Sequence, residues 1–368
     1  MPKAQETVLE IDLKSLEHNY QYLRSKVEPS VKMMAVVKAF AYGSDSVTIA
    51  AKLEKAGIDH FAVAYTKEGE TLRAGGIEKP VLVLHPQPHN LTLLIDNCLT
   101  PSLYSKHILT EFIKTAEALK LKEYPVHINI NTGLNRLGFG LEEIDQVITL
   151  FKNTLAVRLV GIYSHLAASE DLAEKEFTQG QIETFKKASG KILKAFDHKI
   201  MRHLCNTSGI LNYPEATFDM VRTGIGLYGY GNSAQEDKKL KPVGTLKTII
   251  SQIHNIKAEE SVGYNRAFIA KRDTTTATLP IGHADGISRI YGKQKTAVLI
   301  NDKEAPIIGN VCMDMIMVDV TGIECKEGDQ VIIFGKERSA EKLANNAGTI
   351  SYELITSISQ RVKRLIID

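Results

Sequence analysis

The sequence predicts an N-terminal (β/α)8 barrel of the TIM type, followed by a mostly antiparallel β-domain. Between residues 10 and 230, short apolar runs alternate with amphipathic stretches, which is typical of repeated βα units around a parallel sheet. Beyond a charged stretch at 235–242, strand-like runs are separated by turn residues, as in an antiparallel sheet. We therefore expect a barrel over 10–234 and a β-domain over 235–368, to which residues 1–9 could add a strand.

Length and composition agree with two domains and with a small-molecule or protein partner. A chain of 368 residues is longer than one core usually supports. Hydrophobic residues make up 43% of the chain, charged residues 24%, and the formal net charge is +2, so the chain has no electrostatic reason to bind nucleic acid or an anionic membrane. Residues 1–7 lack the pattern of a secretory signal, and no apolar run reaches membrane length, which predicts a cytoplasmic location.

The cysteines argue against a disulfide framework or a metal site. Four are present, widely spaced and without a Cys-x-x-Cys pair: Cys98, Cys205, Cys312 and Cys325. This spacing is typical of reduced, scattered thiols. We expect no bound metal.

Seven runs in the first part of the chain are predicted barrel strands, and an eighth is expected but not located. The seven are 33–37, 61–64, 81–84, 126–130, 159–163, 200–205 and 218–221. The first long element is predicted to be a helix behind Asp12, a suitable N-cap residue, because Leu13, Leu16, Tyr20 and Leu23 follow at helical spacing. Later helices are expected at 49–56 and 144–151.

The charged stretch 235–242 is interpreted as a linker. Strands are expected after it at 246–256, 276–280, 296–300, 315–320 and 330–334.

Lys38 stands directly after the first apolar run, Met33–Val37. A lysine presented from a rigid and water-poor strand end is favoured in its neutral form, which is the form that condenses with an aldehyde to give an imine. Tyr42 follows one turn later and could hold a phosphate. Taken by itself, a lysine in this position is more often an ordinary solvated strand-end lysine, and the rest of the chain favours the imine-forming function.

Residues 224–229 satisfy the G-x-G-x-x-G pattern of dinucleotide-binding proteins. The context argues against that function, because no amphipathic helix follows and position 249 is Ile249 rather than an acid. The same glycines follow a late barrel strand, where TIM barrels often bind phosphate through backbone N–H groups. We therefore predict Gly224 and Ile225 as phosphate donors.

Six stretches, in order along the chain, carry a family resemblance. They are 36–43, 131–139 (NTGLNRLGF), 164–167 (SHLA), 219–225 (DMVRTGI), 262–266 (VGYNR) and 309–314 (GNVCMD). Together they resemble the alanine racemases, and the similarity runs from Val8 to about Arg364. It implies a barrel with a C-terminal β-domain, the cofactor pyridoxal phosphate, and conversion of L-alanine to D-alanine for peptidoglycan.

The resemblance implies a two-base mechanism in a homodimer with shared active sites. Lys38 is the imine-forming lysine and the base on the D side, and the partner's Tyr264 is the base on the L side. Two bases are needed because a single base on one face would return the proton that it took. In the family, a relay through His165 to Arg222 favours the ionised tyrosine.

The resemblance also assigns cofactor and substrate contacts. Arg222 faces the ring nitrogen of the cofactor and keeps it unprotonated, because arginine itself stays protonated. Arg136 bonds the phenolic oxygen of the cofactor and orients the substrate carboxylate, while Asn206 and His165 contact the ring. The phosphate contacts are Tyr42, Thr207, Gly224, Ile225 and Tyr352. From the partner subunit, Met313 and Asp314 close the substrate end.

Three positions depart from the family pattern. Asn129 stands where many relatives carry a carbamylated lysine, so we expect a chloride ion or the neutral amide itself to support Arg136. His283 replaces a tyrosine at the mouth of the substrate channel, which could change entry kinetics or specificity. Phe40 replaces an asparagine, and the sequence offers no physical account of that change.

Alternatives to an alanine racemase remain. A serine or broad-specificity racemase would differ in pocket size near Met313, His283 and Leu84. A non-catalytic pyridoxal-phosphate protein with the same barrel would lack the β-domain. A related decarboxylase would release carbon dioxide without inverting its substrate.

Overall fold

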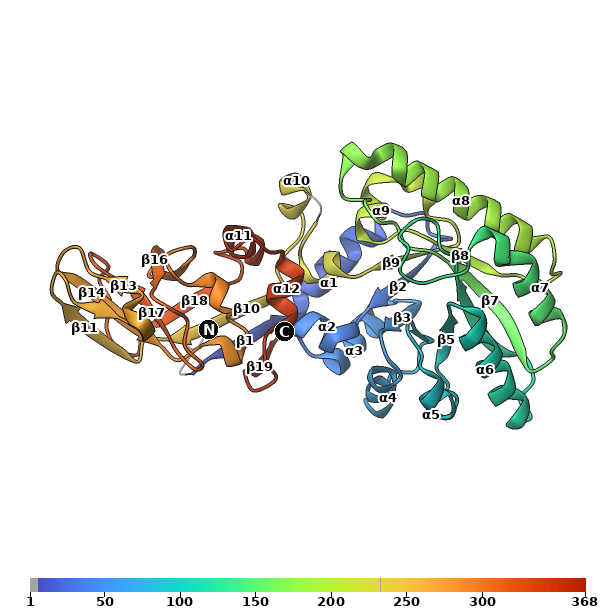
Figure 1. Cartoon of the computed structure of the whole chain (residues 1–368), viewed down its shortest axis with the longest axis horizontal. Coiled ribbons are helices and arrows are strands. Elements are labelled where there is room, and N and C mark those ends of the chain that lie inside the picture. The colour runs from blue at the N-terminus through green and yellow to red at the C-terminus, as the bar shows by residue number, and fades with distance from the viewer. Residues whose placement is uncertain (1–5, 232) are drawn as a thin grey trace.

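A closed barrel of parallel strands forms one lobe of the molecule, and a large sheet forms the other (Figure 1). The computed structural model describes residues 6–231 and 233–368. The barrel strands are β2 (Lys32–Val36), β3 (His60–Val63), β4 (Val81–Val83), β5 (Thr100–Leu103), β6 (Tyr124–Asn129), β7 (Val157–Tyr163), β8 (Met201–His203) and β9 (Met220–Thr223). Each strand pairs in parallel with the next, and β2 pairs with β9 to close the barrel. The predicted TIM-type barrel is confirmed.

The eighth barrel strand is β5. Its sequence, Thr-Pro-Ser-Leu, has no apolar run, which explains why the sequence analysis did not locate it. The other barrel strands begin or end within a few residues of the predicted bounds. The largest difference is at β9, where the predicted run 218–221 gives a strand at 220–223.

Helix α1 precedes the first barrel strand, and the later helices follow the barrel strands in the order expected of βα units. They are α1 (Leu13–Arg24), α2 (Lys38–Gly43), α3 (Ser46–Ala56), α4 (Thr66–Ala74), α5 (Leu91–Asp96), α6 (Lys106–Ala118), α7 (Ile144–Lys152), α8 (Lys175–Leu193) and α9 (Thr207–Asn212). Asp12 caps α1 as predicted, since its Oδ1 accepts a hydrogen bond of 2.9 Å from the Ser15 N–H.

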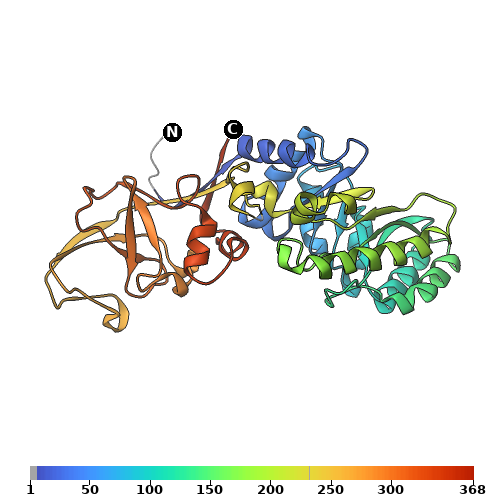
Figure 2. The same cartoon turned by 90° about the horizontal axis from the view of Figure 1, so that it is seen from above.

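The second lobe contains a nine-stranded sheet, which confirms the predicted, mostly antiparallel β-domain. In spatial order its strands are β11 (Gln252–Ile256), β14 (Thr274–Leu279), β17 (Ile316–Asp319), β16 (Lys303–Ile308), β15 (Ala297–Ile300), β18 (Gln330–Phe334), β10 (Gly244–Ile249), β1 (Val8–Asp12) and β19 (Lys363–Ile367). β1 pairs antiparallel with β10 and parallel with β19. β1 and β19 lie where the two lobes meet (Figures 1 and 2).

Two predictions in this part of the chain are wrong. The stretch 246–256 is not one strand, because the chain turns at Ile250 and Ser251 to form β10 and then β11. The stretch 235–242 is not entirely a linker, because Ser233 caps a short helix, α10 (Ala234–Asp237). The predicted domain boundary falls inside this helix and stays a prediction.

Other elements of the second lobe were not anticipated. They are the ribbon of β12 (Ser261–Val262) and β13 (Phe268–Ile269), strands β16 and β19, and helices α11 (Ala340–Asn346) and α12 (Ser351–Thr356). β16 was missed because it contains Lys303, Glu304 and Pro306, which are unusual in a strand.

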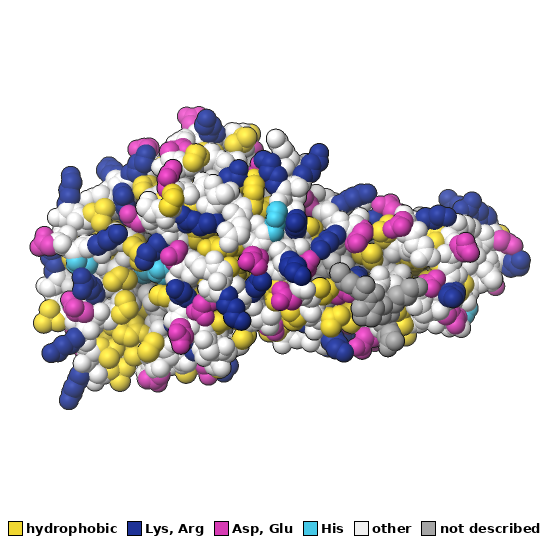
Figure 3. All heavy atoms as spheres, turned by 180° about the vertical axis from the view of Figure 1, so that it is seen from behind, with side chains coloured by type: hydrophobic (Ala, Val, Ile, Leu, Met, Phe, Trp, Pro, Cys, Tyr) yellow, Lys and Arg dark blue, Asp and Glu magenta, His cyan; other side chains and the backbone are white. Residues whose placement is uncertain are grey.

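The glycines of the G-x-G-x-x-G pattern lie in a setting unlike a dinucleotide-binding fold. They follow β9 of the closed barrel, and a single short 3-10 turn, η5 (Ile225–Tyr228), comes next. On the face shown in Figure 3, basic and acidic side chains are intermixed over both lobes. Within residues 6–231 and 233–368, no helix has the length and apolar character needed to cross a bilayer.

Candidate active site

A cavity of about 610 Å³ lies at the carboxyl ends of the barrel strands, where TIM barrels carry their active sites. Its wall brings together the predicted site residues of the barrel and one from the β-domain: Lys38, Tyr42, Arg136, His165, Asn206, Thr207, Arg222, Gly224, Ile225 and Tyr352. Leu84 and Asn129, which the sequence analysis also named, line it too.

Four predicted residues lie elsewhere in the chain. Tyr264, His283, Met313 and Asp314 all belong to the β-domain and do not line this cavity. Tyr264 is 72% exposed and Met313 is 60% exposed. Tyr264 begins the turn between β12 and β13, which Figure 1 shows in the outer part of the β lobe, away from α2. A single chain therefore keeps the two predicted bases apart.

The segment after Lys38 is a left-handed turn rather than an ordinary helix. Ala39, Phe40, Ala41 and Tyr42 all have φ between 51° and 56°. L-residues pay about 1–2 kcal/mol each for this conformation, so the surrounding structure must hold it. The amide of Ala39 donates a hydrogen bond of 2.6 Å to Glu68 Oε1, and the ring of Tyr42 stacks on Tyr228 with centroids 4.6 Å apart.

Gly43 ends the turn and packs directly on α12. Its φ is 83°, and a Cβ atom at this position would overlap the carbonyl oxygen of Ile355. α12 also carries Tyr352, whose ring lies 6.0 Å from that of Tyr42. The β-domain thus contributes Tyr352 to the cavity lining.

We expect Gly43→Ala to destabilise the protein by about 2 kcal/mol or more, because alanine is strained at this φ and collides with α12. The measurement is chemical denaturation of the purified variant beside Gly57→Ala. Gly57 also has a positive φ, 95°, but its Cβ would meet only the Tyr20 hydroxyl, at an ordinary 3.9 Å. An equal loss in both variants would show that backbone strain, and not the contact with α12, explains the effect.

The environment of Lys38 favours the neutral amine. Burial lowers the pKa of Lys38, the positive charge of Arg136 lowers it further, and the carboxylate of Glu68 opposes both effects. A neutral amine at this place can act as a nucleophile or accept a proton.

Arg222 is 4% exposed and is held by several acceptors. Its Nη2 donates to the carbonyl oxygen of Ser164 at 2.6 Å, and its Nη1 donates to Nδ1 of His203 at 2.9 Å. Burial lowers the pKa of Arg222 to about 10, so the guanidinium remains charged at neutral pH.

His165 lies beside Arg222, with 3.4 Å between its Nδ1 and Nη2 of the arginine. Burial, followed by the charges of Arg222 and Arg136, lowers the pKa of His165 to about 3. His165 is therefore neutral, and Nδ1 faces a group that can only donate. This geometry places the ring proton on Nε2.

Another part of the cavity lining consists of hydroxyl groups and a glycine backbone. Thr207 Oγ1 lies 3.3 Å from the amide nitrogens of both Gly224 and Gly226. A Cβ atom at Gly224 would overlap the hydroxyl of Tyr42. Burial raises the pKa of Tyr42 and raises that of Tyr352 to about 12, so both remain hydroxyl donors at neutral pH.

The structure shows the surroundings of the three residues that depart from the family pattern. Asn129 ends β6, is 9% exposed, and shares the cavity wall with Arg136. Phe40 lies under the guanidinium of Arg364, whose Cζ is 5.6 Å from the ring centroid. The third departure, His283, is exposed on the β-domain.

The sequence analysis missed several residues that shape the site. Glu68 accepts the amides of Ala39, Ala64 and Tyr65, and its position in the first turn of α4 was the only available signal. His203 holds Arg222 and is itself bonded through Nε2 to His127 Nδ1 at 2.9 Å. Both histidines lie in predicted strands, but their partners come from other strands.

The comparisons with known proteins agree along the whole chain. Residues 11–232 match the family model "Alanine racemase, N-terminal domain", and residues 243–366 match "Alanine racemase, C-terminal domain". This chain belongs to the alanine racemase family. The alanine racemase of Clostridium novyi is 35% identical over 374 residues, which cover 97% of this chain and 94% of that protein.

Solved alanine racemases share the fold described above. The structure from Clostridium difficile 630 is 34% identical, has a TM-score of 0.92, and covers 100% of this chain and 97% of its own. The alanine racemase from Bartonella henselae, solved with covalently bound pyridoxal phosphate, is 30% identical with a TM-score of 0.89 and covers 99% and 100%. Family membership makes the protein an isomerase.

Proposed function

We propose that the protein racemises alanine with pyridoxal phosphate, using Lys38 and the partner's Tyr264 as the two bases. The observation that carries the proposal is that Lys38, whose pKa is lowered by burial and by Arg136, lines the same cavity as the charged Arg222. We propose the cytoplasm as its location and the supply of D-alanine for peptidoglycan as its role.

The residues present fit the cofactor. Lys38 would hold it covalently, and the hydroxyls of Tyr42, Thr207 and Tyr352, with the amides of Gly224 and Ile225, would hold its phosphate. The lack of a side chain at Gly224 supports this assignment, because a Cβ atom there would fill the space beside Tyr42. Asn206 and His165 would contact the ring, and Arg136 would bond its phenolic oxygen. When bound, pyridoxal phosphate supplies the electron sink that makes the α-proton of alanine removable.

Arg222 would control the electronic character of the site. Its guanidinium cannot accept a proton and remains charged despite burial, so it would donate to the ring nitrogen without protonating it. Such an arrangement gives a weaker electron sink than a carboxylate would give. We expect it to restrict side reactions.

Racemisation needs proton transfer on both faces of the α-carbon. Lys38 Nζ would remove or return the proton on the D side, and the hydroxyl of the partner's Tyr264 would do so on the L side. In this relay, His165 accepts a hydrogen bond from Arg222 at Nδ1, which leaves its Nε2–H free to donate to the tyrosinate oxygen. Arg136 would orient the substrate carboxylate.

The proposed homodimer rests on the location of the β-domain residues. Tyr264 and Met313 are large and exposed, and neither lines the cavity of its own chain, so they would need a second chain to act on one. The partner's Met313 and Asp314 would close the substrate end, and His283 would lie near the entrance.

A chloride ion near Asn129 is the proposed support for Arg136. An amide cannot supply the negative charge of a carbamylated lysine, whereas a bound halide can. Crystals grown with bromide should show an anomalous peak between Asn129 and Arg136. A site without that peak would leave the neutral amide as the support.

The decisive experiment is proton NMR of L-alanine in deuterated water with the purified protein and added pyridoxal phosphate, together with chiral analysis. We expect loss of the α-proton signal and appearance of D-alanine, both absent with Lys38→Ala. Exchange of the α-proton without D-alanine would contradict the second base.

Other outcomes distinguish the alternatives. Faster turnover of serine than of alanine would favour the serine or broad-specificity racemase, and release of carbon dioxide would favour a decarboxylase. The match of residues 243–366 to the C-terminal family domain argues against a non-catalytic protein with the barrel alone.

A further inference from the structure

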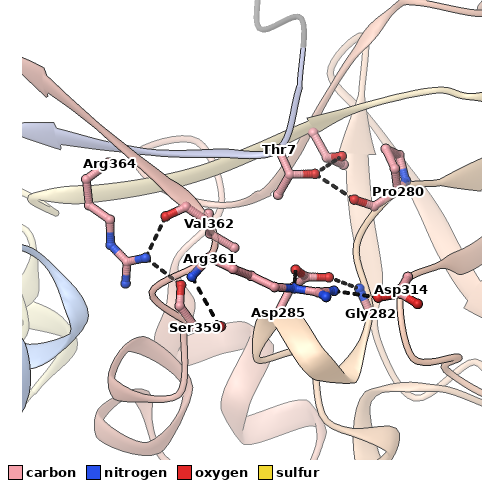
Figure 4. Close-up of polar contacts among 10 residues, drawn as sticks. Thr7, Pro280, Gly282, Asp285, Asp314, Ser359, Arg361, Val362 and Arg364 are labelled. Atoms are coloured by element: carbon pink, nitrogen blue, oxygen red, sulfur yellow. Dashed lines mark hydrogen bonds and ion pairs between the residues drawn. The ribbon is translucent and has the colours of Figure 1, made fainter.

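Two arginines near the C-terminus lie in one short segment but contact different regions. Arg364 contacts the turn that follows Lys38, and Arg361 contacts the two β-domain loops that carry His283, Met313 and Asp314. Figure 4 shows Arg361 between Asp285 and Asp314, with Arg364 among the carbonyl groups of its own segment. The segment runs from Ile358 into β19, at the junction of the two lobes. Neither arginine lines the cavity.

Arg364 uses all five of its N–H donors on backbone carbonyl oxygens. Two of these carbonyls follow the Lys38 turn: Gly43 accepts from Nη2 at 2.8 Å, and Ser44 accepts from Nε at 3.2 Å. The other three belong to the C-terminal segment: Ile358, Ser359 and Val362. The same guanidinium stacks over Phe40. Arg364 therefore fastens the left-handed turn at its C-terminal end, as Glu68 does at its N-terminal end.

This arrangement requires a guanidinium. A lysine at position 364 would keep the charge but would offer three donors from a single point, and it could not reach both groups of carbonyls at once. Since each residue of the left-handed turn is strained, loss of the Arg364 hydrogen bonds should destabilise the turn itself.

Arg361 connects two loops of the β-domain. Its Nε donates to Oδ1 of Asp285 and its Nη2 donates to Oδ1 of Asp314, each at 2.7 Å. The side chain of Asp285 is only 9% exposed, and its Oδ2 accepts the Gly282 amide at 2.8 Å. Exposed ion pairs usually contribute little, but loss of Arg361 would leave the buried Asp285 carboxylate without its cationic partner.

The two loops are also joined through their backbones. The amide of His283 donates to the Cys312 carbonyl, and the amide of Ala284 donates to the Met313 carbonyl, both at 3.0 Å. A side chain at Gly282 would overlap the carbonyl oxygens of Cys312 and Met313. The backbone bonds and Arg361 therefore hold the loops of His283, Met313 and Asp314 against each other.

We propose that Arg361 and Arg364 are positioning residues for opposite halves of the active site. Arg364 sets the Lys38 turn of its own chain, and Arg361 sets the loop pair that presents Met313, Asp314 and His283 to the partner's cavity. This inference rests on the proposed function, because only a shared site gives the loop pair a substrate to contact.

The test is amide hydrogen exchange of the purified full-length protein in two variants, Arg361→Gln and Arg364→Gln. The reporters for the turn are the hydrogen-bonded amides of Ala39, Ala41 and Ser44, and those for the loop pair are the amides of His283, Ala284 and Asp285. We expect each variant to accelerate exchange about tenfold in its own region and to leave the other region unchanged. Each variant thus serves as the control for the other.

Steady-state kinetics give a second readout. Arg361→Gln should raise KM for alanine and change the ratio of serine to alanine turnover, with kcat retained, because the substrate end is loosened. Arg364→Gln should lower kcat, because Lys38 is displaced. The lysine variants, Arg361→Lys and Arg364→Lys, should accelerate amide exchange in the same regions as the glutamine variants. Lysine keeps the positive charge but lacks the planar set of guanidinium N–H donors.

Each outcome decides the proposal. Faster exchange in both regions from either variant, or in neither region, would overturn it. If a glutamine variant does not fold, the corresponding lysine variant provides the regional comparison. A wild-type protein that leaves alanine unchanged, together with the expected exchange pattern, would refute the proposed function but not the role of the two arginines in holding the turn and the loops.

Discussion

Mixing Lys38→Ala protomers with Tyr264→Phe protomers should restore about a quarter of the wild-type racemase activity, because random pairing makes half of the dimers mixed and each mixed dimer has one intact site of two. Each variant alone should lose about a thousandfold in kcat, the usual contribution of a positioned acid or base. Recovery is expected because the intact site takes Lys38 from one chain and Tyr264 from the other.

Two affinity tags allow the mixed dimer to be isolated, and its activity should then be about half that of the wild type. A matched control pairs Lys38→Ala with the double variant Lys38→Ala/Tyr264→Phe. This pair contains no Lys38 in either chain and should stay inactive. A mixed dimer that forms but shows no recovery would contradict the shared site, and so would a Tyr264→Phe variant with full activity.

The sequence predicted the barrel wherever local pattern and tertiary role agree. A strand such as β4 is a continuous apolar run buried along its whole length, so its sequence reveals it. β5 was not located because Pro101 and Ser102 interrupt its pattern, and its place is fixed by pairing with β4 and β6. The break between β10 and β11 was missed because both strands are apolar enough to be read as one run.

The site residues were predictable as a set, but their geometry was not. Ordered motifs identified the residues that line the cavity, including Tyr352 from the other lobe. The left-handed turn could not be anticipated, because Ala39, Phe40 and Ala41 have no local preference for positive φ. Contacts from distant parts of the chain, Glu68, Arg364 and α12, impose it.

Arg222 is a second case in which the sequence predicted the residue but not its geometry. The motif located it, but its orientation depends on acceptors in β8 and in Ser164, directly after β7, that no local pattern links to it. The position of Tyr264 is a related case, since the motif identified the residue and its exposure became known only from the fold.

Acidification from pH 7.5 to 5.5 should lower the free energy of unfolding by about 5 kcal/mol, at about 1.4 kcal/mol for each of four buried histidines. Burial lowers the pKa of His60 to about 4, and burial lowers the pKa of both His127 and His165 to about 3. Burial also lowers the pKa of His203 well below its usual value. All four are therefore neutral in the folded protein throughout this range.

The sign follows from proton binding. Below pH 6.5 the unfolded chain protonates these histidines and the folded chain does not, so stability is complete above pH 6.5 and declines as the pH falls toward the folded pKa values. Urea unfolding at pH 7.5, 6.5 and 5.5 measures the decline. His60→Gln should remove about a quarter of it, because His60 is one of the four and its buried Nδ1 has no partner within the described residues. An unfolding free energy that is equal at pH 7.5 and 5.5 would mean that the barrel accepts protons without opening, and that Arg222 tolerates a charged His203 beside it.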